Sequence, residues 1–500
     1  MQFFKKAKRA LCVWLLVAMV AALASGCAKE PCPAEQEYAQ VSTYTLDLFL
    51  NPDDHTMVGN LCLDFFNAET DSLAELRFYI FPNSFARESY GVFDEEDMES
   101  AYPHGFSSGS LVVQSVTQGG EKLNWRYGGE QNQVLVVEFQ GALEPGQSVA
   151  VDVAYTVTIP QSLGRFGYSD KTFSLVNCNP ILAVYDQGRW FDEYLYYPVG
   201  DPFYSDVANY KGTVRMPKGY DAAVTGTQQT TKDSQTGEVY IAFDAPMVRD
   251  FGFVASDQFV KTCARVGDVL VTSYAYRDTR AAEARLALET GKKSVRFFSS
   301  LFGQYAYREL DVVQCGFFIG GMEYPGMVLI DDSQYTPESR FVLETVVAHE
   351  TAHQWWYAAL GNNQVTEPWL DEALTDYSTE LYMVYKNGGK PGSDPRVGRL
   401  PEGLDTMISV WNPGGSGIDA PVTAFPNNTA YSLVVYYQGR DMFAQLCEEL
   451  TPDVFFEALR QYYEDNLFGI VSRTTLVTAF EKQSGRKLDG WFDSRLNPAS

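Results

Sequence analysis

The residue pattern of this chain changes once, near Arg280, and that change limits the folds open to it. Before it, short runs rich in Val, Thr and aromatic residues alternate with Gly and Pro turn clusters, as in residues 44–50, 134–139 and 148–159. Many short strands with few crossover helices predict an antiparallel β domain. After it, residues 281–302 carry apolar side chains at helical spacing among charges, and the last hundred residues look mainly helical.

Length and pattern together predict a multidomain β plus α/β protein. A chain of 500 residues is too long for one ordinary core, so two or three domains are expected. We place an N-terminal antiparallel β domain at residues 41–278 and an α-rich domain, in which strands mix with helices, at residues 279–500.

The first forty residues have the features of a targeting signal followed by a tether. A positive segment (Lys5, Lys6, Lys8 and Arg9) precedes an apolar stretch, residues 11–23, that is too short to span a bilayer comfortably. Residues 1–26 are therefore predicted to be a signal peptide. Its end, Leu23-Ala24-Ser25-Gly26-Cys27, resembles the lipobox of bacterial lipoproteins, which implies a lipid on Cys27 and a place on the extracytoplasmic face of the cell membrane. An ordinary secretory cleavage or an uncleaved short anchor are the alternatives, and residues 27–40 are expected to be a polar tether.

Charge and cysteine content exclude several classes of function. The formal net charge of −26 would repel nucleic acid and anionic headgroups, so no nucleic-acid partner is expected. The six cysteines beyond Cys27 are widely spaced without a C-x-x-C pair, which excludes a zinc cluster and favours buried free thiols. Whether an exported chain oxidises them is open from sequence.

The segment most specific for chemistry is His349-Glu350-Thr351-Ala352-His353. Thr336-Pro337-Glu338 is a helix start signal, and no Gly or Pro follows until Gly361. Residues four apart share one face of a helix, so both imidazoles can reach one ion, and Glu350 lies beside it as a base for water. This arrangement predicts a zinc peptidase site with His349 and His353 as ligands and Glu350 as the catalytic base.

A second segment supplies a third ligand at a fixed offset. Glu372 stands in Trp369-Leu370-Asp371-Glu372-Ala373, nineteen positions after His353. With the histidine motif, this resembles the gluzincins of the aminopeptidase N family, whose third ligand is a glutamate at this spacing. The resemblance covers roughly residues 41–497 and implies one Zn²⁺ per chain and a thermolysin-like, mostly helical catalytic domain at residues 279–500. Asp376 is a candidate partner for one ligand ring, or an ordinary exposed carboxylate.

Two further segments resemble that family and concern the substrate. Gly320-Gly321-Met322-Glu323-Tyr324 is similar to its G-x-M-E-N segment, whose glutamate binds the free α-amino group, although Tyr324 stands where Asn is usual. Residues 431–439 resemble its Y-x-K-G segment, which makes Tyr436 the expected oxyanion-stabilising tyrosine, with Tyr437 as the rival. In the β domain the family often has a second amine anchor, and the matching region offers only Asn177 and Asn179.

The sequence therefore predicts a lipid-anchored zinc aminopeptidase that acts on peptides. One alternative is an endopeptidase or dipeptide-releasing enzyme on the same scaffold, which is favoured if Glu323 does not face the cleft. Another is a lipoprotein that binds peptides without turnover. The presence of Glu350 argues against it, because a binding module needs no general base. The preferred side chain, the natural substrate and the oligomeric state cannot be read from the sequence.

Overall fold

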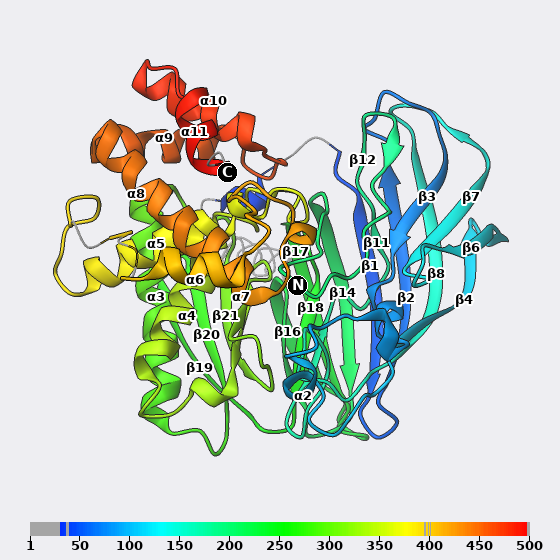
Figure 1. Cartoon of the computed structure of the whole chain (residues 1–500). Coiled ribbons are helices and arrows are strands. Elements are labelled where there is room, and N and C mark those ends of the chain that lie inside the picture. The colour runs from blue at the N-terminus through cyan, green and yellow to red at the C-terminus, as the bar shows by residue number, and fades with distance from the viewer. Residues whose placement is uncertain (1–30, 37–39, 395–396, 399, 401, 498–500) are drawn as a thin grey trace, which may run out of the picture.

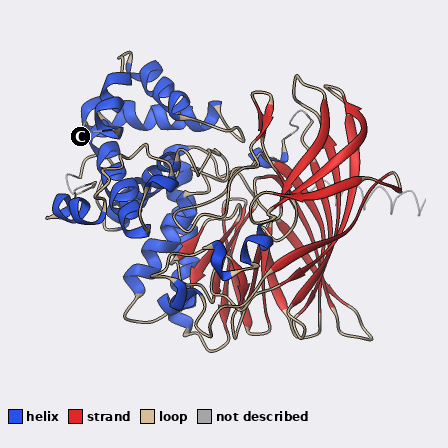
Figure 2. Cartoon of the chain, turned by 45° about the vertical axis from the view of Figure 1, so that its right-hand side comes forward, coloured by secondary structure: helices blue, strands red, loops and turns tan. Residues whose placement is uncertain are grey.

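The computed structural model describes residues 31–36, 40–394, 397–398, 400 and 402–497. Strands gather on one side of the molecule and helices on the other (Figures 1 and 2). The predicted signal peptide and Cys27 lie outside the described residues. Within the described part of the chain, no helix combines the length and apolar character needed to cross a membrane.

The N-terminal domain is built from four sheets. The largest is an eight-stranded sheet with the order β16-β17-β14-β1-β2-β8-β4-β5. Its strands are β1 (Thr43–Asn51), β2 (Thr56–Phe66), β4 (Ser110–Gln118), β5 (Glu121–Lys122), β8 (Ser148–Thr158), β14 (Ala208–Met216), β16 (Thr227–Lys232) and β17 (Val239–Val248). Buried and exposed residues alternate along β1 and β2, so one face of this sheet packs on the core while the other meets solvent.

Smaller sheets complete the domain. One contains β3 (Leu73–Tyr79), β6 (Asn124–Gly128), β7 (Val134–Leu143) and β11 (Ile181–Leu182); another contains β9 (Phe166–Tyr168), β10 (Phe173–Val176), β15 (Asp221–Val224) and β18 (Gly252–Ser256). A hairpin joins β12 (Tyr185–Asp186) to β13 (Arg189–Trp190). The predicted antiparallel character holds for the other described pairs, but β1 and β14 run parallel. That pairing joins segments about 160 residues apart, which local pattern cannot reveal.

The catalytic side begins earlier than the sequence suggested. Its five-stranded sheet has the order β19-β20-β21-β23-β22, with β19 (Phe259–Val266), β20 (Val269–Tyr276), β21 (Glu309–Cys315), β22 (Gly321–Met322) and β23 (Met327–Asp331). A boundary at residues 278/279 would cut this sheet between β20 and β21. The division therefore lies between β18 and β19. The boundary was misplaced because β19 and β20 look like more strands of the β domain, whereas β20 pairs in parallel with β21 through the intervening helix α3.

Helices cover this sheet and extend to the end of the chain. They are α3 (Ala281–Phe302), α4 (Arg340–Ala352), α5 (Glu372–Lys386), α6 (Leu404–Trp411), α7 (Asn428–Tyr431), α8 (Gly439–Leu450), α9 (Pro452–Asp465), α10 (Arg473–Ser484) and α11 (Asp489–Leu496), with the short α2 (Met98–Ala101) in the β domain. In Figure 1, α3 and α4 lie over the green strands of the sheet, and the last helices (orange to red) gather beyond them. The helix predicted at residues 281–302 is confirmed by α3.

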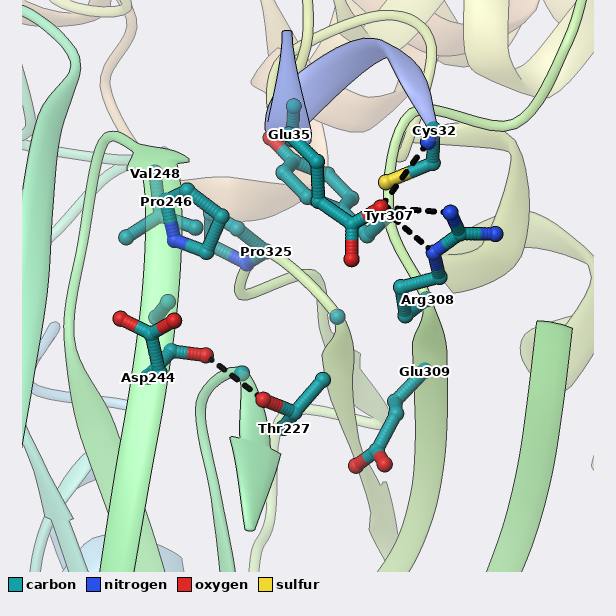
Figure 3. Close-up of a pocket in the computed structure, with 14 residues that line it drawn as sticks. Cys32, Glu35, Thr227, Asp244, Pro246, Val248, Tyr307, Arg308, Glu309 and Pro325 are labelled. Atoms are coloured by element: carbon teal, nitrogen blue, oxygen red, sulfur yellow. Dashed lines mark hydrogen bonds and ion pairs between the residues drawn. The ribbon is translucent and has the colours of Figure 1, made fainter. Parts of the chain in front are cut away.

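Part of the predicted tether is packed against the folded body. The 3₁₀ turn η1 (Pro33–Glu35) buries Cys32 and Ala34, and the Ala34 N–H donates to the carbonyl of Ala306 at 3.0 Å. Figure 3 shows Glu35 accepting hydrogen bonds from Arg308 and from the N–H of Cys32 beside the β17 strand.

A buried arginine joins the two domains. Arg249, which follows β17, donates from Nε to the carbonyl of Tyr357 and from a guanidinium nitrogen to that of Ser205, both at 3.0 Å. A third bond, 2.5 Å long, reaches the carbonyl of Gly469 near the C-terminal helices. A Cβ on Gly361 would overlap the guanidinium, so the backbone there passes directly against it. The arrangement fixes the β domain on the catalytic domain.

Candidate active site

The helix that carries the histidines is shorter than the sequence suggests. α4 ends at Ala352, and His353 is its C-terminal cap. The chain then turns, which brings the carbonyl of Trp356 to 3.1 Å from His353 Nδ1. A continued helix would point that carbonyl away from the ring. The predicted helical placement of both histidines on one face is correct, and the early end serves to hold one of them.

The third predicted ligand starts the next helix. Pro368–Leu370 forms a 3₁₀ turn, and α5 begins at Glu372 with Asp371 as its N-cap, whose carboxylate accepts from the Glu372 N–H at 2.9 Å. α5 packs on α4, so Glu372 faces the two histidines. Its Oε2 lies 3.2 Å from His353 Nε2 and 3.5 Å from His349 Nε2.

Each imidazole has an acceptor at Nδ1, so each can present the lone pair of Nε2 to the same point. Thr379 Oγ1 donates to the carbonyl of Thr375, so it is left to accept from His349 Nδ1 at 3.4 Å. His353 Nδ1 donates to Trp356, as described above. The two Nε2 atoms, 3.2 Å apart, therefore bring their lone pairs together, which is repulsive unless a cation lies between them.

These donors fit a zinc ion. The ligand atoms of His349, His353 and Glu372 lie within 4.8 Å of one another. Bonds of about 2.0–2.1 Å in a tetrahedron separate ligand atoms by about 3.3 Å, and the three observed separations lie close to that value. Two neutral imidazoles and a carboxylate are also the donor set of catalytic zinc sites. Asp376 stands 3.9 Å from His349 Nδ1 and pairs with Arg440 at 3.1 Å, so its hold on the ring is weak.

The predicted base lies beside this centre. Glu350 is buried, and burial raises its pKa to about 7. Gly321 on β22 lies directly against its carboxylate, since a Cβ there would overlap Oε1. An edge glycine thus lets the backbone of β22 approach both the base and a substrate lying along the strand.

The predicted amine-binding residue also faces the cleft. Glu323 is buried next to the metal centre, where Gln364 donates to its Oε1 at 3.3 Å and to Asp371 at 2.8 Å. Burial raises the pKa of Glu323 well above its ordinary value. Tyr324, which replaces the usual Asn, is fully buried behind it. Gly320, Gly321 and Met322 line the same cleft.

Two residues of the β domain were missed from sequence. Asp201 lies close to Glu323 and Glu372, and it forms a buried ion pair with Arg165. Arg165 Nε also lies 3.1 Å from Met322 Sδ. Asn177 and Asn179 are buried but do not line the cleft, whereas Asp201, which follows Gly200, does. No local signal marked Arg165.

The structure distinguishes between the two candidate tyrosines, Tyr436 and Tyr437. Both belong to η7 (Ser432–Gln438), a π-helical stretch of the kind found at functional sites. Tyr436 lines the metal cleft, with its ring 5.9 Å from that of His349 and nearly parallel to it. Tyr437 points instead to a neighbouring groove, with Arg440 over its ring at 4.8 Å. The geometry therefore favours Tyr436.

The cleft, of about 480 Å³, carries a strongly negative lining. Six carboxylates line it (Asp97, Asp201, Glu323, Glu350, Glu372 and Asp376) against one guanidinium, that of Arg165. Burial opposes the ionisation of Glu372, but the neighbouring His353 and His349 hold its pKa below the ordinary value. Burial would likewise lower the pKa of His353, yet Glu323 and Glu372 raise it well above normal. Such a site favours cationic ligands, a metal ion and an ammonium group among them.

Comparison with known proteins agrees with this geometry. Residues 286–494 match the family model described as the peptidase family M1 domain. Aminopeptidase N of Haemonchus contortus is 25% identical over 395 residues, which cover 73% of this chain and 39% of that protein. Aminopeptidase N of Lactobacillus helveticus is 24% identical over 46% of this chain and 29% of its own length. The chain thus spans well under half the length of these relatives.

A solved structure extends the likeness to almost the whole chain. The M1 zinc metallopeptidase of Deinococcus radiodurans aligns with a TM-score of 0.62 at 16% identity, covering 92% of this chain and 95% of that one. The shared fold includes both the β domain and the helical domain. The match over residues 286–494, together with the placement of His349, His353 and Glu372, shows that this part of the chain is a peptidase family M1 domain similar to that of aminopeptidase N.

Proposed function

We propose that this protein is a zinc-dependent aminopeptidase that releases N-terminal residues from peptides. The observation that carries the proposal is the position of Glu323, a buried carboxylate facing the cleft beside the metal centre and the base. A buried carboxylate selects a cationic group through a charge-assisted hydrogen bond, and the α-ammonium of a peptide is such a group. A related M1 metallopeptidase has been solved with a Tyr-Ser-Ala substrate bound, which supports peptides as the substrate class.

The chain's own residues account for the steps of hydrolysis. His349, His353 and Glu372 would hold zinc, which when bound would act as a Lewis acid toward the scissile carbonyl and lower the pKa of water. Glu350 takes a proton from the attacking water and passes it to the leaving amine, which its raised pKa suits because it must hold and then release that proton. Tyr436 donates a hydrogen bond to the oxygen on which negative charge develops.

Glu323 and the edge of β22 set the orientation of the substrate in the cleft. Glu323, with Asp201 close by, binds the ammonium group, so the first residue lies next to the metal centre. The β22 edge offers its backbone to an extended peptide. Because the amine is fixed, the bond presented to Glu350 is the first peptide bond.

Comparing one peptide in free and N-acetylated form tests the proposal. Acetylation removes the charge and adds bulk where Glu323 lies, so hydrolysis should be abolished. Glu323→Gln should weaken kcat/KM for the free peptide by about 1.5–3 kcal/mol, about 10- to 150-fold, as for a buried charge-assisted hydrogen bond. Glu448→Gln, at an exposed position of α8, is the matched control and should change nothing.

The cleavage products, identified by mass spectrometry, distinguish the alternative activities. Cleavage of the acetylated peptide at an internal bond, at a similar rate, would mean an endopeptidase. Release of two residues at a time would mean a dipeptide-releasing enzyme. Glu350→Gln should keep zinc and fold while lowering turnover by several orders of magnitude, and bound peptide with no turnover in the unmodified protein would support a binding lipoprotein instead.

We also propose that the enzyme is held at the extracytoplasmic face of the cell membrane by a lipid on Cys27. The support is the lipobox-like sequence at residues 23–27 and the positive segment that precedes it. Cys27→Ala should release the protein from the membrane fraction or leave its signal uncleaved. Cys263→Ala, which removes an exposed thiol of the β domain, is the control. A Cys27→Ala protein that is processed and anchored as before would contradict the proposal.

A further inference from the structure

A second groove opens directly from the metal cleft. It has a volume of about 850 Å³ and shares four lining residues with the cleft: Thr345, Asp376, Ser432 and Tyr436. Those shared residues include the tyrosine that faces the metal centre. The two hollows therefore adjoin at these four residues, next to the metal centre.

Two walls of this groove are formed by the helices that carry the predicted zinc ligands, α4 and α5. On α4, Phe341 and Thr345 stand eight and four residues before His349, which places them on the same face. On α5, Thr379 and Met383 stand seven and eleven residues after Glu372, again along one face. Glu323 lies at the other end, where α4 ends and α5 begins, beside Asp371. From the metal centre, the groove thus runs away from the amine-binding carboxylate.

The length of the groove suits several residues of an extended peptide. Eight helical residues from His349 to Phe341 cover about 12 Å at 1.5 Å per residue. An extended chain advances about 3.3 Å per residue, so about three to four residues fit between the metal centre and Phe341. Because the amine lies on the Glu323 side, these are the residues that follow the scissile bond.

The chemistry of the groove is apolar rather than acidic. Phe341 is 70% exposed at its mouth, and Met383, Val384 and Tyr437 line its walls. Its carboxylates are already paired: Arg440 contacts Asp376 at 3.1 Å and Glu380 at 2.8 Å. The two carboxylates share one guanidinium, and the single negative charge that remains disfavours acidic side chains, whereas exposed apolar surface gains from being covered.

We infer that this groove binds the residues after the scissile bond and selects peptides with apolar side chains at their third and fourth positions. The inference rests on the proposed function, because it takes the direction of the substrate from Glu323. The enzyme would then prefer peptides of at least four or five residues, and Phe341 and Met383 would be its specificity-determining side chains.

Binding and hydrolysis together test the inference. The probes are the pentapeptides Ala-Ala-Leu-Leu-Ala and Ala-Ala-Asp-Asp-Ala, together with the single-residue substrate alanine p-nitroanilide. Binding of both pentapeptides is measured by calorimetry on the zinc-loaded Glu350→Gln protein, which removes turnover from the readout. We expect the apolar pentapeptide to bind about tenfold more tightly than the acidic one, and Phe341→Ala to remove most of that difference.

The active protein gives the second readout. Phe341→Ala should raise KM for the apolar pentapeptide several-fold and leave the anilide unchanged, since the anilide does not reach the groove. Val410→Ala, which truncates an apolar side chain 66% exposed on α6 outside both hollows, is the matched control and should change neither. Because Phe341 is exposed, its loss should not unfold α4.

Equal binding of the two pentapeptides, or an equal loss for anilide and pentapeptide in Phe341→Ala, would overturn the inference. Failure of the proposed function looks different. A zinc-loaded protein that hydrolyses neither the anilide nor free peptides would refute the aminopeptidase, while the binding preference would still report on the groove.

Discussion

Substituting Gly321 by alanine tests the placement of the catalytic base without touching the base itself. Gly321 lies on β22, and its φ is not in the left-handed region, so an alanine can adopt the backbone without strain. The added Cβ would overlap Glu350 Oε1 and lie 2.6 Å from the carboxylate carbon. The substitution therefore acts on the position of Glu350, whose flexible side chain can move at small cost.

The size of the effect follows from that overlap. An ordinary contact is 3.4 Å or more, so the carboxylate carbon must move by about 0.8 Å from its 2.6 Å separation. A displacement of about 1 Å at a reacting group lowers the rate by about 10²-fold, or about 2.7 kcal/mol. Stability should be unchanged or slightly higher, because replacing glycine in a strand lowers the entropy of the unfolded chain.

The assay is kcat/KM on a free-amine peptide, with zinc content and melting temperature measured on the same sample. Gly414→Ala, where a Cβ meets open space, should leave all three quantities unchanged. Gly320→Ala, at φ +101°, should lower the melting temperature through backbone strain. A Gly321→Ala protein that binds zinc and keeps kcat/KM within a few-fold of the original would refute this placement of Glu350.

Three further outcomes are expected. Alanine at any of His349, His353 and Glu372 should abolish stoichiometric zinc binding, measured by metal analysis after dialysis, while the helices remain folded by circular dichroism. Tyr436→Phe should lower kcat about 10²- to 10³-fold, as for the loss of one oxyanion donor, whereas Tyr437→Phe should not; the reverse would exchange their roles. Arg249→Met should lower the free energy of unfolding by about 3 kcal/mol, seen as a lower melting temperature, because it leaves buried carbonyl groups without donors.

Local sequence was enough to predict the metal centre. The spacing of His349 and His353 fixes their common helical face, and the resemblance to the aminopeptidase N family implied Glu372 as the third ligand. The helix at residues 281–302 was also predictable, because its apolar period continues through twenty-two residues. These features depend on neighbours within a few turns, which a single sequence displays.

The features that sequence could not predict depend on contacts between distant segments. Strands β19 and β20 resemble those of the β domain, and only their pairing with β21 assigns them to the catalytic sheet. Asp201 reaches the cleft because the two domains pack together, which no local pattern expresses. The choice between Tyr436 and Tyr437 required the orientation of η7, since adjacent residues on a helix point in directions roughly 100° apart.

The excess of carboxylates explains why the β domain contributes Arg165 as well as Asp201. Asp201 next to Glu323 and Glu372 would be strongly disfavoured as a third buried anion without a counter-charge. Arg165 compensates the charge of Asp201 through an ion pair in which the two side chains are only 9% and 8% exposed. Among the described lining residues Glu323 has no arginine or lysine partner: the amide of Gln364 donates to it, and His353, a predicted zinc ligand, lies within 4.8 Å. A cationic ligand at this position would favour the ionised form of Glu323, whose pKa burial otherwise raises. The β domain therefore adds an ion pair, Asp201 with Arg165, beside Glu323 and away from Asn177 and Asn179.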